Sequence, residues 1–174
     1  NWGADIVKVG IGQGSPCTTK DKTGFTVPMF SCVLNCAEVY GSHPEETAHE
    51  FLNKETPVPI IADGGIKCNG DIAKALVAGA TMTMAGGVFA SCVDSPASTT
   101  TFNGVEHKAY FGSSSAENKG HGKHIEGKLI NIHSSKINYE NKLEEIKQDL
   151  QSSISYGGGK DLNCFKNVDY ELHR

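Results

Sequence analysis

The feature that most constrains the fold is a glycine-rich loop that follows a short apolar run near the start of the sequence. Ile6–Val9 is β-branched and apolar apart from one lysine, which predicts a buried strand. Gly10, Gly12 and Gly14 then alternate with other residues. Because glycine adopts positive φ and lets the backbone approach a partner closely, these positions predict a loop that wraps tightly around something small.

Cys17 follows this loop and is the first candidate for chemistry. A loop at the carboxyl end of a strand is where (β/α)8 barrels carry their active sites. An exposed thiolate in electropositive surroundings attacks electron-poor carbon well, so Cys17 is a candidate nucleophile. The alternative is a small buried cysteine after a tight turn, and the loop alone leaves both interpretations open.

Composition excludes several classes of protein. The 174 residues carry a formal net charge of −4 and 38% hydrophobic residues, which suits one soluble domain with a core. No apolar run approaches the ~18 residues of a membrane span, and no signal peptide is visible, so we expect no membrane partner. The mild negative charge argues against a nucleic-acid partner, although backbone N–H groups can still bind a nucleotide.

The metal-binding residue types form no convincing centre. Six cysteines occur without a CxxC pair, and the spacing of Cys32 and Cys36 suits one helix face. Buried free thiols are therefore favoured over metal ligands or disulfides, which predicts a reducing, cytoplasmic compartment. His121 and His124 could suggest a metal site, but two such ligands favour a solvated loop.

A second buried strand is predicted over residues 58–62 and a third strand over residues 81–84, and each is followed by a pair of glycines. Gly64-Gly65 and Gly86-Gly87 would let a phosphate approach backbone amides, as in the phosphate site that barrels build after their last two strands. Asp63 could accept two hydrogen bonds from a ribose diol. A turn aspartate that bonds its own backbone is the alternative.

Periodicity predicts the other elements. A helix is expected from Pro28, another over residues 45–54 within an extension at 41–57, and a third over Ile72–Ala78. Thr99–Tyr110 is expected to be a β-hairpin, with Asn103-Gly104 as its type I′ turn. A last amphipathic helix is predicted over Tyr139–Leu150, with its inward residues at Leu143, Ile146 and Leu150.

From Gly10 onward the chain resembles the IMP dehydrogenase and GMP reductase family of purine-nucleotide oxidoreductases. The family signature, Gly-x-Gly-x-Gly-Ser-x-Cys-Thr-Thr, is matched by Gly10–Thr19, although Gln13 stands where the family usually has proline. The resemblance continues over nearly the whole chain, in family order, through residues 60–66, 85–87, 110–115, 125–128 and 149–160.

This resemblance implies an α/β fold, a (β/α)8 TIM barrel in which the signature loop follows the sixth strand. Such a barrel takes ~250 residues. Residues 1–174 would therefore be the C-terminal portion of a single barrel domain, covering roughly its last three βα units, a flap at about 98–128 and the C-terminal helix. The resemblance also implies a homotetramer.

The chemistry implied by the resemblance is a covalent thioimidate between Cys17 and purine C2. The dehydrogenase passes a hydride to NAD and then hydrolyses this intermediate, whereas the reductase expels ammonia from GMP, accepts a hydride from NADPH and releases IMP. Thr19 and Glu126 resemble the pair that relays a proton to the leaving amino group. A leaving group this poor needs general acid catalysis, typically worth about 10²–10⁴-fold.

The resemblance also assigns the binding residues, each by its position in the matched motifs. The phosphate falls to Ser15, Gly65, Gly86 and Gly87, with Gly64 beside them; the ribose to Asp63; and the base to Gly112, Ser113 and Ser114. The carbonyls of Gly12, Gly14 and Cys17 resemble a potassium site. Ile11, Gly12 and Ser113 are the candidates for NADPH contact, although much of that site is expected outside this chain.

The two activities differ in the need for a hydrolytic base. In the dehydrogenase that base is mainly an arginine on the mobile flap, followed by tyrosine. This sequence has no arginine before Arg174, and only ten residues separate Ser115 from Glu126. The sequence therefore favours the reductase. IMP dehydrogenase, which converts IMP to XMP with NAD, is the alternative within the family, and a non-catalytic nucleotide-binding fragment is the alternative outside it.

Overall fold

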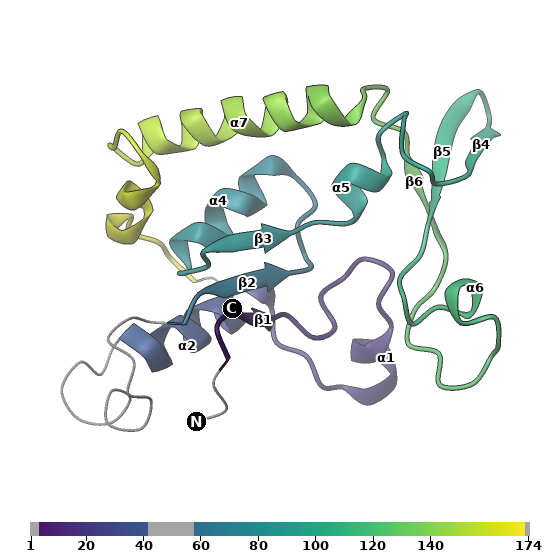
Figure 1. Cartoon of the computed structure of the whole chain (residues 1–174), viewed down its shortest axis with the longest axis horizontal. Coiled ribbons are helices and arrows are strands. Elements are labelled where there is room, and N and C mark those ends of the chain that lie inside the picture. Colours follow the sequence, from purple (N-terminus) through teal and green to yellow (C-terminus); the bar gives the residue numbers. More distant parts are fainter. Residues whose placement is uncertain (1–3, 42–57, 173–174) are drawn as a thin grey trace.

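A parallel sheet of three short strands lies at the centre of the structure. The computed structural model describes residues 4–41 and 58–172, and its first strands are β1 (Val7–Val9), β2 (Ile60–Asp63) and β3 (Met82–Met84). Both neighbouring pairs are parallel and β2 is the middle strand. The three predicted strands are confirmed, but the predicted burial of the first was wrong, since no residue of β1 is buried and Ile6 is 49% exposed. Figure 1 shows the carboxyl ends of the strands pointing toward the loop that carries α1.

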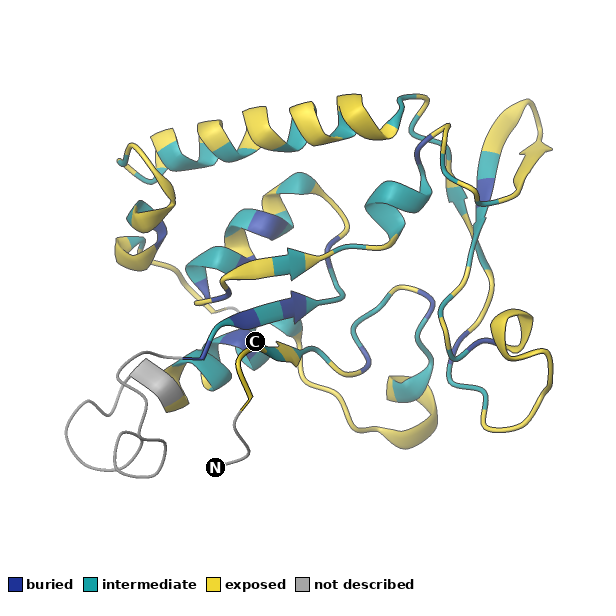
Figure 2. Cartoon of the chain, viewed as in Figure 1, coloured by how far each residue is buried: buried dark blue, intermediate teal, exposed yellow. Residues whose placement is uncertain are grey.

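Two helices pack on this sheet and form the core with it. They are α2 (Met29–Gly41), which begins beside the predicted Pro28, and α4 (Asn69–Val77). The middle strand is the most deeply buried one, with Ile60 and Ala62 almost inaccessible (Figure 2). The buried cluster consists of Val33, Ile60, Ala62, Ile66, Ile72, Ala75, Ala78 and Ala80.

The remaining helical segments are short, and the 41–57 region lies largely outside the structure. The short segments are α1 (Thr19–Thr23), α5 (Gly87–Ala90), α6 (Ala116–Lys119) and η1 (Leu162–Asn167). The helix predicted over residues 45–54 falls outside the described residues, as does nearly all of the predicted extension.

The N-terminus of α4 is fixed by a capping box. Helix α4 begins at Asn69, three residues before the predicted start, because the Asp71 carboxylate accepts hydrogen bonds from the backbone N–H of Lys67 and Cys68, at 2.9 and 3.2 Å. Burial of Asp71 opposes its ionisation, but these two hydrogen bonds hold its pKa below the ordinary value.

A second, antiparallel sheet is formed by β4 (Thr99–Phe102), β5 (Val105–Tyr110) and β6 (Ile130–His133). The predicted hairpin is confirmed, since Asn103 and Gly104 both have positive φ, as a type I′ turn requires. The third strand, β6, was not predicted. It pairs with β5 and returns the chain from the segment that carries Glu126.

The buried Lys108 attaches this second sheet to the segment that follows α5. Its side chain is on β5 and is 4% exposed. Its ammonium group donates to the carbonyl oxygens of Val93, Ser95 and Ala97, at 3.1, 3.3 and 3.4 Å. Because all three acceptors are backbone groups of one short segment, a single cation holds that segment against β5.

Helix α7 (Tyr139–Tyr156) is longer than predicted and faces the core differently. Ile146 and Leu150 pack against the core as expected, but the prediction for Leu143 was wrong, because that residue is 42% exposed. Lys142 takes the inward position instead, with its side chain 13% exposed and its ammonium group 2.8 Å from Glu145. The apolar stem of a lysine can be buried while the charge finds a partner, which hydrophobic spacing does not reveal.

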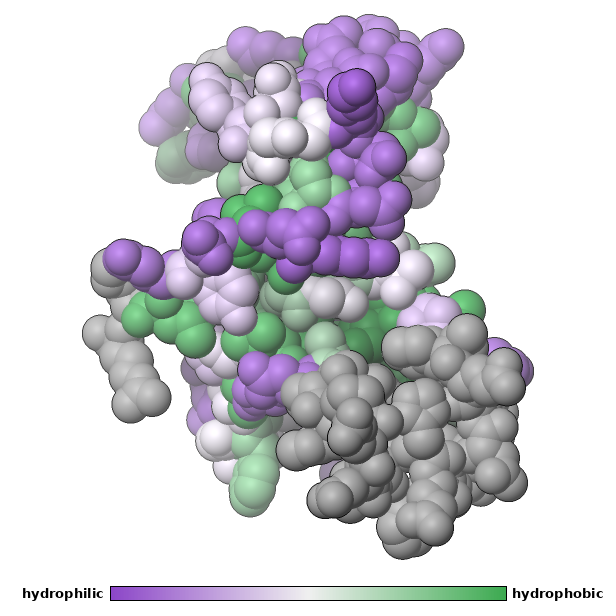
Figure 3. Space-filling model, turned by 90° about the vertical axis from the view of Figure 1, so that its left-hand side faces the viewer, coloured by the Kyte–Doolittle hydropathy of each residue, from purple (hydrophilic) through white to green (hydrophobic). Residues whose placement is uncertain are grey.

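The C-terminal tail packs back onto the core. Phe165 of η1 is buried, and the Tyr170 ring meets Phe30 of α2 edge to face at 5.0 Å. Figure 3 views this end of the molecule and shows a largely hydrophilic upper part with hydrophobic residues visible across the middle. Among the described residues, no helix is long and apolar enough to cross a membrane.

The capping box makes stability sensitive to acid. We predict that Asp71→Ala lowers the free energy of unfolding by about 1 kcal/mol at neutral pH, since two backbone N–H groups lose their acceptor. The folded-state pKa of Asp71 is depressed, so its contribution is complete above the ordinary value of 3.8 and is lost as the pH falls through the folded value.

Urea unfolding of the wild type and Asp71→Ala at pH 7 and below pH 3.8 measures this effect. The difference between the two proteins should shrink in acid. Glu144→Ala, which removes an exposed carboxylate from α7, is the control and should have little effect. A difference for Asp71→Ala that is equally large at both pH values would contradict the account.

Candidate active site

Three predicted catalytic side chains form one hydrogen-bonded series. The Cys17 thiol donates to the Thr19 hydroxyl at 3.2 Å, and that hydroxyl donates to the Glu126 carboxylate at 2.5 Å. Glu126 is 107 residues from Thr19 in the sequence. The structure therefore brings together a nucleophile, a hydroxyl and a carboxylate in the order that a proton relay needs.

Backbone pairing holds Glu126 in this position. Cys17 and Gly127 form an antiparallel bridge. On either side of it, the Thr18 N–H donates to the Glu126 carbonyl and the Lys128 N–H donates to the Pro16 carbonyl, both at 2.9 Å. The position of the carboxylate is thus set by main-chain geometry as well as by its own hydrogen bond.

Glycines let the loops after β1 and β2 interlock. Gly10 has φ +119°, and a Cβ there would lie 2.2 Å from the Asp63 carbonyl oxygen. Gly64 has φ +100°, and a Cβ there would lie 2.7 Å from the Gly14 nitrogen. Since a side chain at either position would clash with backbone, the two loops can pack this closely only without one.

A cavity of about 290 Å³ opens beside Cys17 at the carboxyl ends of these strands. Asp63 of β2, Tyr110 of β5 and Glu126 contribute to its wall. Several residues predicted for base, cofactor or cation contact also line it: Ile11, Gly12, Gly14, Gly112, Ser113 and Ser114. The candidate nucleophile and all three predicted base-binding residues therefore share one cavity.

Two residues of this cavity were missed at the sequence level. The Lys8 ammonium group forms an ion pair with the Asp63 carboxylate, the predicted ribose ligand. Burial raises the pKa of the Tyr110 hydroxyl, and the nearby Asp63 charge raises it further. The lysine within the apolar run of β1 was a visible signal, because a charge there needs a partner.

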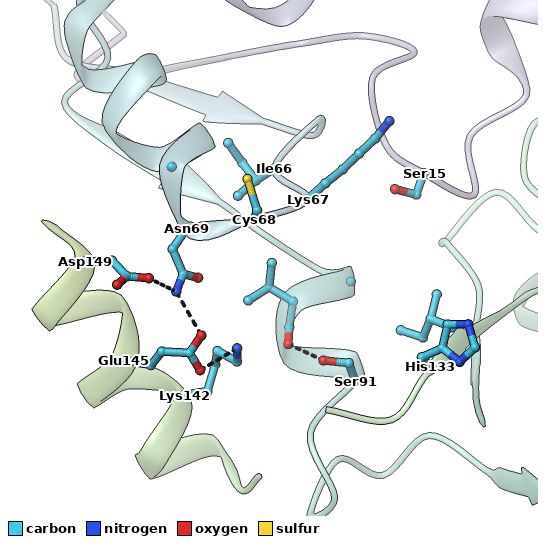
Figure 4. A pocket seen from close by; sticks show the side chains of 14 residues that line it. Ser15, Ile66, Lys67, Cys68, Asn69, Ser91, His133, Lys142, Glu145 and Asp149 are labelled. Carbon is cyan, nitrogen blue, oxygen red and sulfur yellow. Dashed lines mark hydrogen bonds and ion pairs between the residues drawn. The ribbon is translucent and has the colours of Figure 1, made fainter. Parts of the chain in front are cut away.

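The residues predicted to bind phosphate are not all on the same cavity. Ser15 and Gly87 line a second cleft of about 600 Å³, between the signature loop, the start of α4 and helix α7 (Figure 4). In this cleft the Asn69 side chain donates to Asp149 at 2.6 Å and to Glu145 at 3.3 Å.

The other two predicted phosphate residues, Gly65 and Gly86, line neither of these cavities. Gly65 lies against Met29 of α2. Gly86 lies under the Tyr110 hydroxyl, which a Cβ at Gly86 would approach to 2.0 Å. The structure thus joins the catalytic series with the base-binding segment but divides the four phosphate residues among different surroundings.

Cation ligands in the signature loop would have to be carbonyl or hydroxyl oxygens. All six cysteines are free, but the prediction that they are buried was wrong for all except Cys92, and Cys68 is exposed. The described residues contain no group of three or more His, Cys, Asp or Glu side chains that could hold a metal. The Gly14 carbonyl already accepts the Cys17 N–H at 3.0 Å. The Thr18 hydroxyl oxygen is buried and has no hydrogen-bond partner within the described part of the chain.

The fold and site define an α/β protein with a candidate nucleophilic cysteine at the carboxyl edge of a parallel sheet. The family model of the IMP dehydrogenase / GMP reductase domain matches residues 1–171, and the chain belongs to this family.

Individual relatives carry the name of one of the two enzymes. The chain is 45% identical over 174 residues to the GMP reductase of Pediococcus pentosaceus, covering 99% of this chain and 48% of that protein. It is 44% identical to the GMP reductase of Staphylococcus epidermidis, covering 100% and 49%. It is 45% identical over 172 residues to that of Streptococcus pyogenes, covering 99% and 48%. The chain thus spans about half the length of these relatives.

The effect of the Asp63 charge on the pKa of Tyr110 can be tested by titration. Because the Asp63 charge contributes to the raised pKa of Tyr110, Asp63→Asn should move the phenol titration to lower pH. Ultraviolet absorbance of phenolate, with Tyr110→Phe subtracted, reports this group. Glu106→Gln, on the same strand, is the matched control and should leave the titration in place. An unchanged Tyr110 titration in Asp63→Asn would contradict the assigned cause.

Proposed function

We propose that this chain is part of a GMP reductase, which converts GMP to IMP and ammonia at the expense of NADPH in purine nucleotide interconversion. The observation that carries the proposal is the hydrogen-bonded series from Cys17 through Thr19 to Glu126. The names of the relatives support the same reaction. The whole enzyme would be a cytoplasmic homotetramer of (β/α)8 barrels, and residues 1–174 the C-terminal portion of one barrel domain.

The reaction begins with Cys17. The Cys17 thiol gives up its proton through the Thr19 hydroxyl to the Glu126 carboxylate. The resulting thiolate adds to C2 of the purine, and the C2–N bond to the amino group then breaks. Protonated Glu126 passes its proton through the Thr19 hydroxyl to the departing nitrogen, which leaves as ammonia rather than as amide ion. A thioimidate on Cys17 remains. NADPH, when bound, supplies the hydride that reduces C2, and Cys17 then departs as thiolate while IMP is released.

Among the described residues, the cavity offers no uncommitted base to activate water, which favours reduction of this intermediate over its hydrolysis. Hydrolysis would need a group that activates water next to the thioimidate, and the sequence contains no arginine before Arg174. Within the described residues, the titratable side chains that line the cavity with Cys17 are Lys8, Asp63, Tyr110 and Glu126. Glu126 is hydrogen-bonded to Thr19, and Asp63 is ion-paired with Lys8. Both carboxylates are therefore less available to activate a water molecule.

The substrate and its cofactors find suitable groups in the same region. Ile11 is 78% exposed on the cavity wall and, with Gly12 and Ser113, offers apolar and backbone surface to the nicotinamide ring of NADPH. The carbonyls of Gly12, Gly14 and Cys17 would hold potassium, and the unpartnered Thr18 oxygen beside them fits a site that still needs a cation or water.

Nucleotide contacts are divided between the two cavities. Gly112, Ser113 and Ser114 would lie along the base, and Asp63 would bind the ribose with the oxygen that Lys8 leaves free. The phosphate would reach Ser15, Gly65, Gly86 and Gly87, with Gly64 allowing close approach. Gly86 is exposed with the Tyr110 hydroxyl beside it, so that hydroxyl is placed to contact the phosphate as well.

The test follows NADPH absorbance with GMP in potassium buffer, using the full-length protein. Consumption should require GMP and should disappear in Cys17→Ala. Thr19→Val and Glu126→Gln should lower kcat by about 10²–10⁴-fold, because each breaks the proton relay. Glu117→Gln removes a carboxylate from α6 in the same flap and should retain wild-type activity.

Other outcomes would contradict the proposal in distinct ways. Formation of NADH from IMP and NAD, with no GMP-dependent NADPH loss, would identify a dehydrogenase. Binding of GMP without turnover in either direction would identify a nucleotide-binding role. Wild-type activity in Glu126→Gln would refute the relay while leaving the reductase assignment intact.

A further inference from the structure

Two histidines lie side by side on one face of the second sheet, outside the hydrogen-bonded series of Cys17, Thr19 and Glu126. His107 of β5 and His133 of β6 are direct partners in the antiparallel register. Their ring centroids are 4.5 Å apart, with the ring planes tilted by 40°. Directly opposed residues of an antiparallel pair project to the same face of the sheet, so both imidazoles occupy one side of it. Neither histidine contributes to the cavity beside Cys17, and His133 lines the second cleft together with Ser15 and Gly87.

The tautomer of His107 is fixed by a backbone contact. Its Nδ1 lies 3.0 Å from the carbonyl oxygen of Val105. A carbonyl only accepts hydrogen bonds, so Nδ1 carries a proton and Nε2 is the ring nitrogen left for another partner. Histidines that bind metals use this arrangement, in which the ring nitrogen that does not bind the ion donates to a carbonyl or carboxylate. One partner of the pair is therefore already oriented as a ligand.

We propose that His107 and His133 form a two-imidazole site for a divalent transition-metal ion of tetragonal preference, Cu²⁺ or Ni²⁺. Two imidazoles that share one ion through bonds of about 2.0–2.1 Å place their ring centroids about 4.5 Å apart at a right angle and about 5 Å apart at a tetrahedral angle. The observed centroid separation of 4.5 Å is one at which two imidazoles can share an ion. Tetragonal ions with nitrogen ligands are typically Cu²⁺ and Ni²⁺.

The coordination is open, and no other pair of histidines described in the structure shares these features. No group of three or more His, Cys, Asp or Glu side chains gathers within residues 4–41 and 58–172, so water would complete the shell. In the flap, His121 Nδ1 instead accepts the Lys123 N–H at 3.2 Å, and His124 makes no ring contact of the kind that joins His107 and His133.

A bound ion would link the two strands that enclose the segment carrying Glu126. The chain leaves the sheet at Tyr110 and returns at Ile130, which are also register partners. Residues 111–129 lie between them and include the Gly112–Ser114 stretch. An ion that binds the paired strands and not the unfolded chain stabilises the fold by mass action. The inference does not depend on the proposed reductase activity.

Calorimetric titration of the full-length protein with Ni²⁺ tests the site, since this ion does not oxidise thiols. One ion per chain should bind to the wild type. His107→Ala and His133→Ala should each weaken that binding at least about tenfold, as losing a ligand costs no less than losing an outer-shell partner. The double variant His121→Ala/His124→Ala is the matched control and should bind as the wild type does.

A second measurement on the wild type avoids reliance on variants that fold poorly. Ni²⁺ should broaden the imidazole nitrogen–proton NMR signals of His107 and His133 before those of the other histidines, and it should raise the melting temperature. Unchanged binding in both single variants would overturn the proposal. Loss of binding in the flap double variant, or broadening confined to other histidines, would also overturn it.

Discussion

The main-chain pairing between residues 16–18 and 126–128 is the constraint on which the site depends. A hydroxyl and a carboxylate 107 positions apart cannot stay 2.5 Å apart through one part-buried hydrogen bond alone. The antiparallel bridge at Cys17 and Gly127 is flanked by two backbone hydrogen bonds, one at Glu126 and one at Lys128. The flap is therefore part of the site, since its backbone holds Glu126 against the signature loop.

This pairing is supported from below by the parallel sheet and from the side by the second sheet. The positive φ angles at Gly10 and Gly64 let the loops after β1 and β2 interlock over a core in which Ile60 and Ala62 of β2 are nearly inaccessible. The buried Lys108 holds the second sheet to the segment after α5. The parallel sheet positions the loop that carries Thr19, and the second sheet positions the ends of the segment that carries Glu126.

Much of this arrangement could be predicted from the sequence where the signal is local. The three parallel strands, helix α2 and the Asn103-Gly104 turn follow from apolar runs and turn chemistry. The catalytic series could be predicted only through the family motifs, because Glu126 has no local pattern that links it to Thr19. Lys142 replaced Leu143 on the inner face of α7, since spacing cannot distinguish a buried lysine stem from a buried leucine.

Interactions between distant segments were the ones that sequence patterns did not provide. The pairing of β6 with β5, the Lys8–Asp63 ion pair and the burial of Phe165 all require knowledge of which segments meet. Sequence patterns also did not show that Ser15 and Gly87 line a different cavity from Cys17. Motif order places these residues in one family site, whereas their surroundings depend on how the loops pack.

The central claim is that Cys17, Thr19 and Glu126 expel ammonia and leave an intermediate that water attacks slowly. The most direct measurement incubates the full-length enzyme with GMP in the absence of NADPH, followed by peptide mass spectrometry and nucleotide analysis. The account predicts ammonia up to one equivalent per site, a purine adduct on the peptide that contains Cys17, and little XMP. Rapid accumulation of XMP, or ammonia release without any adduct on Cys17, would contradict it.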